Sequence, residues 1–225
     1  MIVHETIYRS MYSKSKRTAL PFRIANRPVL SFAAVFVVVL YCAFTFTSIA
    51  LFPTAFSPVV NYLSDLGNST FNPTGAWFYN AGCILTGLAL LPFYAGFYEW
   101  YTVERRRKSL MVLTQVVGFL SAFSLIMIGV FSEDSMAQHL FWSELFFVFN
   151  LLVLILANIS LMTRPKFIRP IGYYGLAVAV VNLLFVVLTS TPLLEWFTVF
   201  TALVYAGLLA YNTLKLTAPA STQHN

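Results

Sequence analysis

Six long apolar runs constrain this chain more than any other feature of its sequence. A helix needs ~20 predominantly apolar residues to cross a hydrocarbon core of about 30 Å. Runs of that length lie at approximately 28–52, 75–98, 109–131, 140–162, 171–190 and 193–214. The predicted fold class is therefore all-α: a polytopic integral membrane bundle of six transmembrane helices.

Composition supports a membrane protein and argues against a separate soluble domain. Of the 225 residues, 59% are hydrophobic and 10% are charged, whereas about 25% of the residues in soluble domains are charged. We expect three parts: a cytoplasmic basic tail at 1–27, a six-helix transmembrane domain at 28–216 and a cytoplasmic C-terminal tail at 217–225. The net charge of +6 does not indicate a nucleic-acid partner, because the bases do not cluster on a foldable soluble module. Membrane lipids are the expected partners, with a membrane-protein partner or homo-oligomer left open.

The positions of the bases predict the orientation. Of the 14 Lys and Arg residues, six precede the first run, four lie at 105–108, three lie between the fourth and fifth runs, and Lys215 follows the sixth. The three alternate loops carry none. Because short loops rich in Lys and Arg stay cytoplasmic, both termini are expected in the cytoplasm, in the cell membrane if the organism is prokaryotic.

The loop after the first run predicts a short interfacial helix at 57–67. Ser57 followed by proline is a favourable helix start, and Gly67 is a favourable C-terminal cap. The polar residues Asn61, Ser64 and Asp65 share one face of such a helix. That face is expected either to look at water or to turn into the mouth of the bundle.

A polar seam is predicted on the fourth helix. By the helical period, Ser143 and Asn150 lie on the same face as His139, whereas Glu144 points away. Asn150 would lie about 16 Å below His139, near the middle of the bilayer. This seam must face protein, either as a hydrogen-bonded helix contact or as a binding or catalytic pocket.

These segments carry a resemblance to a known family. The order Ser57, then Leu63-Ser-Asp-Leu-Gly67, Phe71-Asn72, Gly129-Val-Phe-Ser-Glu133 and His139 resembles the archaeal and bacterial membrane proteins grouped as domain of unknown function 998. More remotely it is similar to the Frag1/DRAM/Sfk1 membrane proteins. The resemblance implies a six-helix bundle and no settled activity. It also implies that Ser64, Asp65, Gly67, Glu133 and His139 form the family motif.

Together, these patterns predict a polar pocket on the extracytoplasmic face that binds a lipid or another ligand. The candidate binding or motif residues are Ser57, Asn61, Ser64, Asp65, Gly67, Asn72, Glu133, His139, Ser143 and Asn150.

Three alternatives remain open for this set of residues. One is a non-catalytic structural or regulatory membrane protein. Another is a lipid hydrolase or transferase in which His139 acts as general base and Asp65 orients it. In the third, Asp65, Glu133 and His139 hold a metal, although three scattered residues are a weak metal signal. No sequence motif identifies a cofactor.

Overall fold

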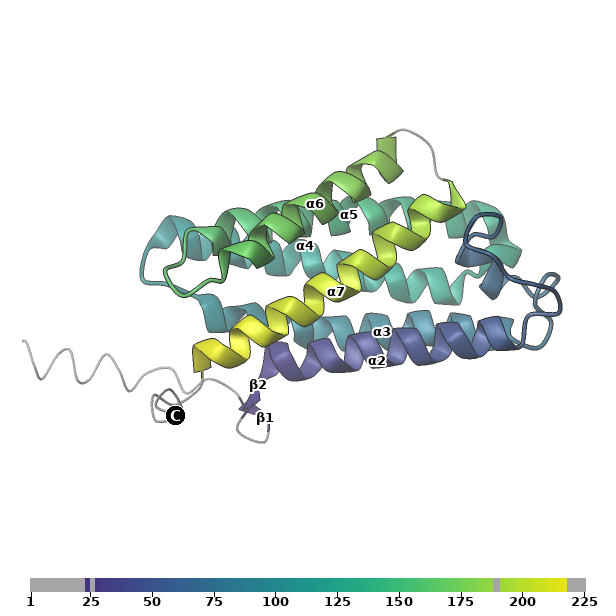
Figure 1. Ribbon diagram of the computed structural model, residues 1–225, viewed down its shortest axis with the longest axis horizontal. Helices are drawn as coiled ribbons and strands as arrows, with labels where there is room; N and C mark the ends of the chain where they lie inside the picture. The colour runs from purple at the N-terminus through teal and green to yellow at the C-terminus, as the bar shows by residue number, and fades with distance from the viewer. Residues whose placement is uncertain (1–22, 25–26, 188–190, 218–225) are drawn as a thin grey trace, which may run out of the picture.

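Six long helices form the body of the molecule (Figure 1). The computed structural model describes residues 23–24, 27–187 and 191–217. The helices are α2 (Val29–Ala50), α3 (Ala76–Ala95), α4 (Arg105–Val130), α5 (Met136–Met162), α6 (Arg169–Val187) and α7 (Pro192–Thr217). Each is long and apolar enough to cross a membrane, alone or with the short helix that adjoins it, so the prediction of a six-helix membrane bundle is confirmed. Most of the predicted 1–27 tail lies outside the described residues.

The helix ends differ from the predicted ends by a few residues, and each difference has a local cause. α4 begins at Arg105 rather than 109, because Lys and Arg favour helix and extend their charged ends toward water. α3 ends at Ala95 and continues as the 3₁₀ helix η2 (Gly96–Trp100), where Gly96 packs against the backbone of Leu30. α7 begins at Pro192, because a proline favours the first turn of a helix.

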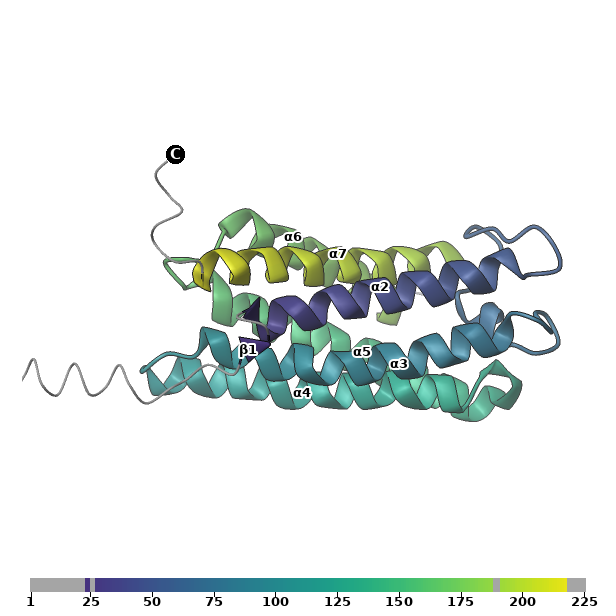
Figure 2. The same cartoon turned by 90° about the horizontal axis from the view of Figure 1, so that it is seen from below.

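The helices form a closed ring in chain order. Each helix from α2 to α6 contacts the next, and α7 returns to contact α2. Figures 1 and 2 show α7 crossing obliquely over its neighbours, while α3 and α4 form the opposite side. This arrangement leaves an interior lined by several helices.

Large apolar side chains cover the outside of the ring. Phe36, Val39, Leu120, Ile159 and Val180 are all more than 40% exposed, and they come from four different helices. In water such a surface would be unstable, whereas a bilayer solvates it. The protein is therefore an integral, multi-pass membrane protein whose outer surface contacts lipids.

The two ends of the ring differ in charge. The basic end carries the α3–α4 and α5–α6 connections, the C-terminal end of α7, and the paired two-residue strands β1 (Arg23–Ile24) and β2 (Arg27–Pro28) (Figure 1). The acidic end carries the α2–α3 and α4–α5 connections and the start of α7, and therefore Asp65, Glu133, Asp134 and Glu195. The even number of helices places Val29 and Thr217 at the same end.

Candidate functional site

A long loop between α2 and α3, residues 51–75, covers the acidic end and is called the cap loop here. The predicted helix at 57–67 is present only in part, as one turn at Ser57–Asn61 and the 3₁₀ helix η1 (Ser64–Gly67). Between them, Tyr62 N–H donates to the Asp65 carboxylate at 3.2 Å and Leu63 N–H donates to the Glu195 carboxylate at 2.7 Å. Side chains that capture backbone N–H groups in this way compete with helical hydrogen bonds. The helix is therefore interrupted.

A buried hydrogen-bond cluster fixes the base of the cap loop to α2. The Asn72 side chain, which is 0% exposed, donates to Ser48 Oγ at 2.9 Å and to the Leu66 carbonyl at 3.0 Å. Its Oδ1 accepts from Gly75 N–H, and Ser48 Oγ donates to the Gly75 carbonyl. Asn72 was predicted as a site residue, and the structure places it in this cluster beneath the loop rather than in the interior cavity.

Other contacts attach the cap loop to the rest of the acidic end. Trp196 Nε1 on α7 donates to the Asn61 carbonyl at 3.1 Å. Ser69 donates to Asp134 Oδ1 from its backbone N–H and its hydroxyl, at 3.0 and 2.9 Å. The loop is thus bonded to α2, to α7 and to the α4–α5 connection, so it forms a fixed cover over the ring.

Glu195, in the first turn of α7, is the central residue that the predicted site did not include. Its side chain is only 8% exposed. The sequence places Glu195 at the outer end of the last apolar run, and the helical period that puts it on one face with Ala202 and Ala206 was the one signal of an inward direction. Its inward direction depends on the rotation of α7 about its own axis, which packing against the cap loop fixes through the Leu63 and Trp196 contacts.

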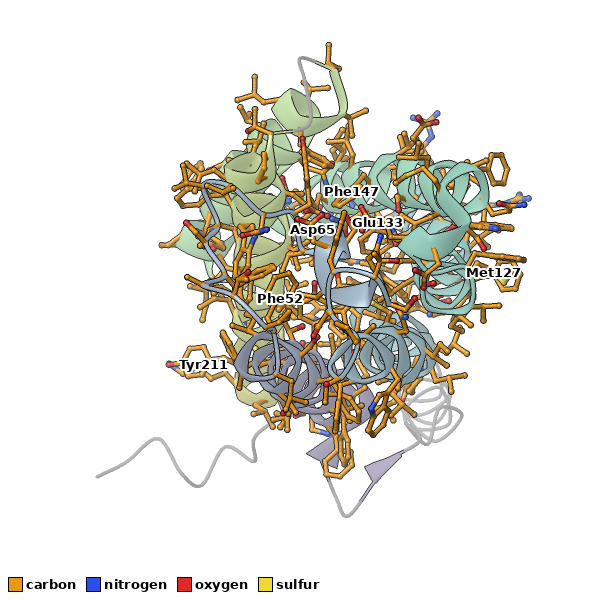
Figure 3. All side chains as sticks on the ribbon, turned by 90° about the vertical axis from the view of Figure 1, so that its right-hand side faces the viewer. Phe52, Asp65, Met127, Glu133, Phe147 and Tyr211 are labelled. Atoms are coloured by element: carbon orange, nitrogen blue, oxygen red, sulfur yellow. The ribbon has the colours of Figure 1, made fainter. Side chains whose placement is uncertain are left out.

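Three carboxyl groups interact with one another at the acidic end of the ring. Glu195 interacts electrostatically with Asp65 and Glu133, and Figure 3 shows Asp65 and Glu133 close to the middle of the ring, seen from the acidic end. The sequence has no Lys or Arg at 28–104, 109–163 or 170–214. The Lys and Arg residues of α4, α6 and α7 lie at the opposite, basic end, so no described Lys or Arg lies beside these acidic groups.

An elongated cavity of about 100 Å³ lies inside the ring, next to these carboxyl groups. At the acidic end it is lined by Ser64, His139, Ser143 and Glu195, and farther in by Asn150. The predicted seam of His139, Ser143 and Asn150 thus lies along one wall of the cavity. Glu144 is exposed on the other side of α5, as the helical period predicted.

The deeper lining of the cavity is apolar and aromatic. It includes Leu90, Phe93, Phe97, Leu154 and Leu209. On α7 the lining runs from Glu195 to Leu209, which corresponds to about 21 Å along a helix. The cavity is therefore long and narrow, most polar at the acidic end and mainly apolar and aromatic along the rest, where Thr86 and Asn150 are polar exceptions.

Two buried hydroxyl groups along the cavity have no hydrogen-bond partner among the described residues. They belong to Thr198, which is 0% exposed, and Thr86, which is 2% exposed. Buried polar groups are usually paired with protein or with bound molecules. Unpaired hydroxyls in a cavity wall indicate a position where a bound molecule supplies the missing partner.

His139 is held by the backbone rather than by Asp65. Its Nδ1 lies 2.9 Å from the Phe131 carbonyl oxygen, which only accepts, so Nδ1 donates and the neutral ring keeps a lone pair on Nε2. The Asp65 carboxylate instead accepts from Asn61 Nδ2 and Tyr62 N–H. Across the described ranges, no group of three His, Cys, Asp or Glu residues is placed to hold a metal ion. Those residues therefore give no support to the metal alternative.

Comparison with known families agrees with this fold. The model of the family described as "Protein of unknown function (DUF998)" matches residues 33–212, which include most of α2 to α7. The chain belongs to this family. No curated protein and no solved structure matches it.

Gly67 and Gly129, which belong to the segments that resemble the DUF998 family, let the cap loop and the end of α4 approach α3 closely. A Cβ atom on Gly67 would collide with the Asn80 side chain, which donates to the Gly67 carbonyl at 3.0 Å. A Cβ atom on Gly129 would lie 2.5 Å from the Asn80 carbonyl oxygen. Both glycines therefore pack against Asn80, which explains by close contact why small residues stand at these two positions.

Two predicted residues of this DUF998 protein, Ser57 and Asn61, and the neighbouring Asn68 stabilise the cap loop itself. Asn61 Oδ1 accepts from Ser57 N–H at 3.1 Å. Asn68, which begins an Asn-Ser-Thr glycosylation triplet, is 9% exposed and accepts from Thr70 and Phe71 N–H. The amide of Asn68 is thus engaged in the fold of the loop.

Proposed function

We propose that this DUF998 protein binds a single-chain amphipathic lipid, or one chain of a larger lipid, inside the ring. The polar end of the ligand lies beside Glu195, His139 and Ser64, and its apolar chain extends toward Leu209. The observation that carries the proposal is the lining of one cavity, which is polar at the acidic end and mainly apolar and aromatic beyond it.

The length of the cavity suits such a ligand. The chain of a membrane lipid spans half of the hydrocarbon core, about 15 Å. The α7 wall of the cavity is about 21 Å long by helical rise. A lipid chain with part of its head group therefore matches the available length, and the unpaired hydroxyls of Thr86 and Thr198 lie along its path.

The orientation of the site follows from the distribution of bases. The loops at the basic end carry the Lys and Arg residues that favour the cytoplasm. We therefore place both termini in the cytoplasm and the cap loop on the extracytoplasmic face. The bound lipid then comes from the outer leaflet or from the extracytoplasmic solution.

Cavity-filling variants test the proposal. Ala157→Leu and Ala202→Leu add side-chain volume in the cavity lining, whereas Ala177→Leu makes the same change on the exposed surface of α6. Native mass spectrometry of the purified proteins should find a retained lipid in the wild type and in Ala177→Leu, and less of it in the two filling variants. Equal lipid retention in all four proteins would contradict interior binding.

The geometry of His139 favours a second candidate, a lipid hydrolase or transferase. With Nδ1 donating to the Phe131 carbonyl, the lone pair of a neutral His139 lies on Nε2, where it suits a general base, and Ser143 lies one turn farther along the same helix wall. Turnover of the retained lipid by the wild type, lost in a folded His139→Ala protein, would support catalysis. Retained lipid that stays intact, or turnover unaffected by His139→Ala, would remove this candidate and leave binding.

A further inference from the structure

The head group of the bound lipid can be inferred from the charges that surround the polar end of the cavity. We infer that the head group is a cation, an amine or a quaternary ammonium, seated against Glu195. This inference rests on the proposed function, since it names the class of lipid that the same cavity takes.

Selectivity between lipids must come from the polar end of the cavity. A lipid chain is already in an apolar solvent while it lies in the bilayer, so transfer into an apolar cavity gives little hydrophobic gain. The residues beside Glu195 therefore decide which lipid is retained.

The polar end gathers carboxyl groups without a Lys or Arg neighbour. Glu195 is 8% exposed and interacts with Asp65 and Glu133. The sequence has no Lys or Arg in α2, α3, α5 or the cap loop, and none in α7 before Lys215. A buried carboxylate is costly unless it is paired and hydrogen-bonded. Among the described residues, the Glu195 carboxyl group accepts a hydrogen bond from Leu63 N–H, and a cationic ligand would supply the opposite charge that stabilises its ionised form.

A second, independent observation marks the same position as a ligand site. Thr198 follows Glu195 by three residues, on the same face of α7, and both line the cavity. The Thr198 hydroxyl is fully buried and has no partner in the described part of the chain. An amine head group beside Glu195 would donate an N–H to that hydroxyl, whereas a quaternary ammonium has no N–H and would contact it without a hydrogen bond.

Aromatic rings complete a surface that suits a cation. Tyr41 and Tyr79 line the cavity near Glu195, and their rings meet edge to face with centroids 6.5 Å apart. Aromatic faces attract ammonium groups through the ring quadrupole. A phosphate or sulfate head group would instead place a second negative charge against Glu195, Asp65 and Glu133.

Four photoreactive amphiphiles with one shared alkyl chain and different head groups test this inference. The head groups are a primary amine, a trimethylammonium, an uncharged hydroxyl and a phosphate. They are added to the full-length protein in uncharged maltoside micelles, and cross-linked residues are located by mass spectrometry. We expect the two cations to label the cavity lining at least about tenfold more than the phosphate does.

Matched variants assign the preference to Glu195. Glu195→Gln keeps an oxygen that accepts from Leu63 N–H but removes the charge, so cation labelling should fall about tenfold while labelling by the hydroxyl probe persists. Glu144→Gln, at an exposed carboxylate on α5, should change neither the labelling by the cations nor the labelling by the hydroxyl probe.

The outcomes distinguish a failure of the cationic head-group inference from a failure of the proposed lipid binding. Phosphate labelling that equals or exceeds cation labelling, or a cation preference that survives Glu195→Gln, would overturn the inference and leave lipid binding intact. Absence of cavity labelling by all four probes, in a protein that elutes as a folded species, would overturn the proposed function as well.

Discussion

The carboxylate of Glu195 has two roles that substitution can separate. It accepts the Leu63 N–H that the interrupted helix leaves free, and it places an ionisable group at the polar end of the cavity. Glu195→Gln preserves the acceptor, whereas Glu195→Ala removes it. A buried N–H left without an acceptor costs about 1–3 kcal/mol.

We therefore predict that Glu195→Ala lowers the stability of the protein by about 1–3 kcal/mol, while Glu195→Gln stays near the wild type. Thermal unfolding in detergent measures both, with Glu144→Ala as the exposed control. Equal destabilisation by the alanine and glutamine variants would show that the Leu63 hydrogen bond does not fix the cap loop.

Asn72 and Asn150 make a second matched pair. The Asn72 side chain bonds to Ser48, Leu66 and Gly75 in a fully buried position, whereas Asn150 lines the cavity. Asn72→Ala should cost at least ~2 kcal/mol, because several buried groups lose their partners together, and should expose the cap loop to protease. Asn150→Ala should leave both unfolding and proteolysis close to wild-type values. The reverse order of effects would contradict the assignment of Asn72 to the scaffold.

Sequence patterns located most polar residues of the cavity but not Glu195. His139, Ser143 and Asn150 were predictable because one helical period places them on a common face. The helical period places Glu195 on the same face as Thr198, Ala202 and Ala206, but small and hydroxyl side chains on one face do not by themselves indicate that a carboxylate at the end of the helix is buried. Its burial follows from contacts with Leu63 and the cap loop, which are 132 residues away in the chain.

At the level of elements, the six helices were predictable and the segment at 57–67 was predictable only in part. Long apolar runs determine a spanning helix almost by themselves, because lipid offers backbone groups no other partner. The cap loop has no such constraint. There Asp65 and Glu195 bind backbone N–H groups and convert an expected helix into a turn and η1.

Differences in packing between helices predict opposite effects on stability when Gly129 and Gly207 are replaced by alanine. Gly129→Ala would place Cβ 2.5 Å from the Asn80 carbonyl oxygen between α4 and α3, whereas Cβ at Gly207 on α7 meets nothing within 4 Å. Gly129→Ala should therefore destabilise by about 1–3 kcal/mol. Gly207→Ala should raise stability by about 0.5–1 kcal/mol through helix propensity. Thermal unfolding of the two variants side by side measures the difference, and a tolerated Gly129→Ala would contradict the close α3–α4 approach.

For the whole molecule, the distribution of Lys and Arg alone predicts which end of the bundle faces the cytoplasm. Val59 in the cap loop is 69% exposed, and Arg106 is exposed at the opposite, basic end. In intact cells, a membrane-impermeant thiol reagent should label Val59→Cys at once and Arg106→Cys only after lysis. The wild type, whose free Cys42 and Cys83 lie within α2 and α3, is the blank. Labelling of Arg106→Cys before lysis would reverse the orientation.

The central claim is that the ring encloses a bound amphiphile, and an experimental density map tests it most directly. Cryo-electron microscopy of the protein extracted with its native lipids should reveal elongated non-protein density. The density should begin beside Glu195, Thr198 and His139 and extend along α7 toward Leu209. A well-resolved map in which side chains close this space, or in which the space contains only separate water-sized features, would contradict the account.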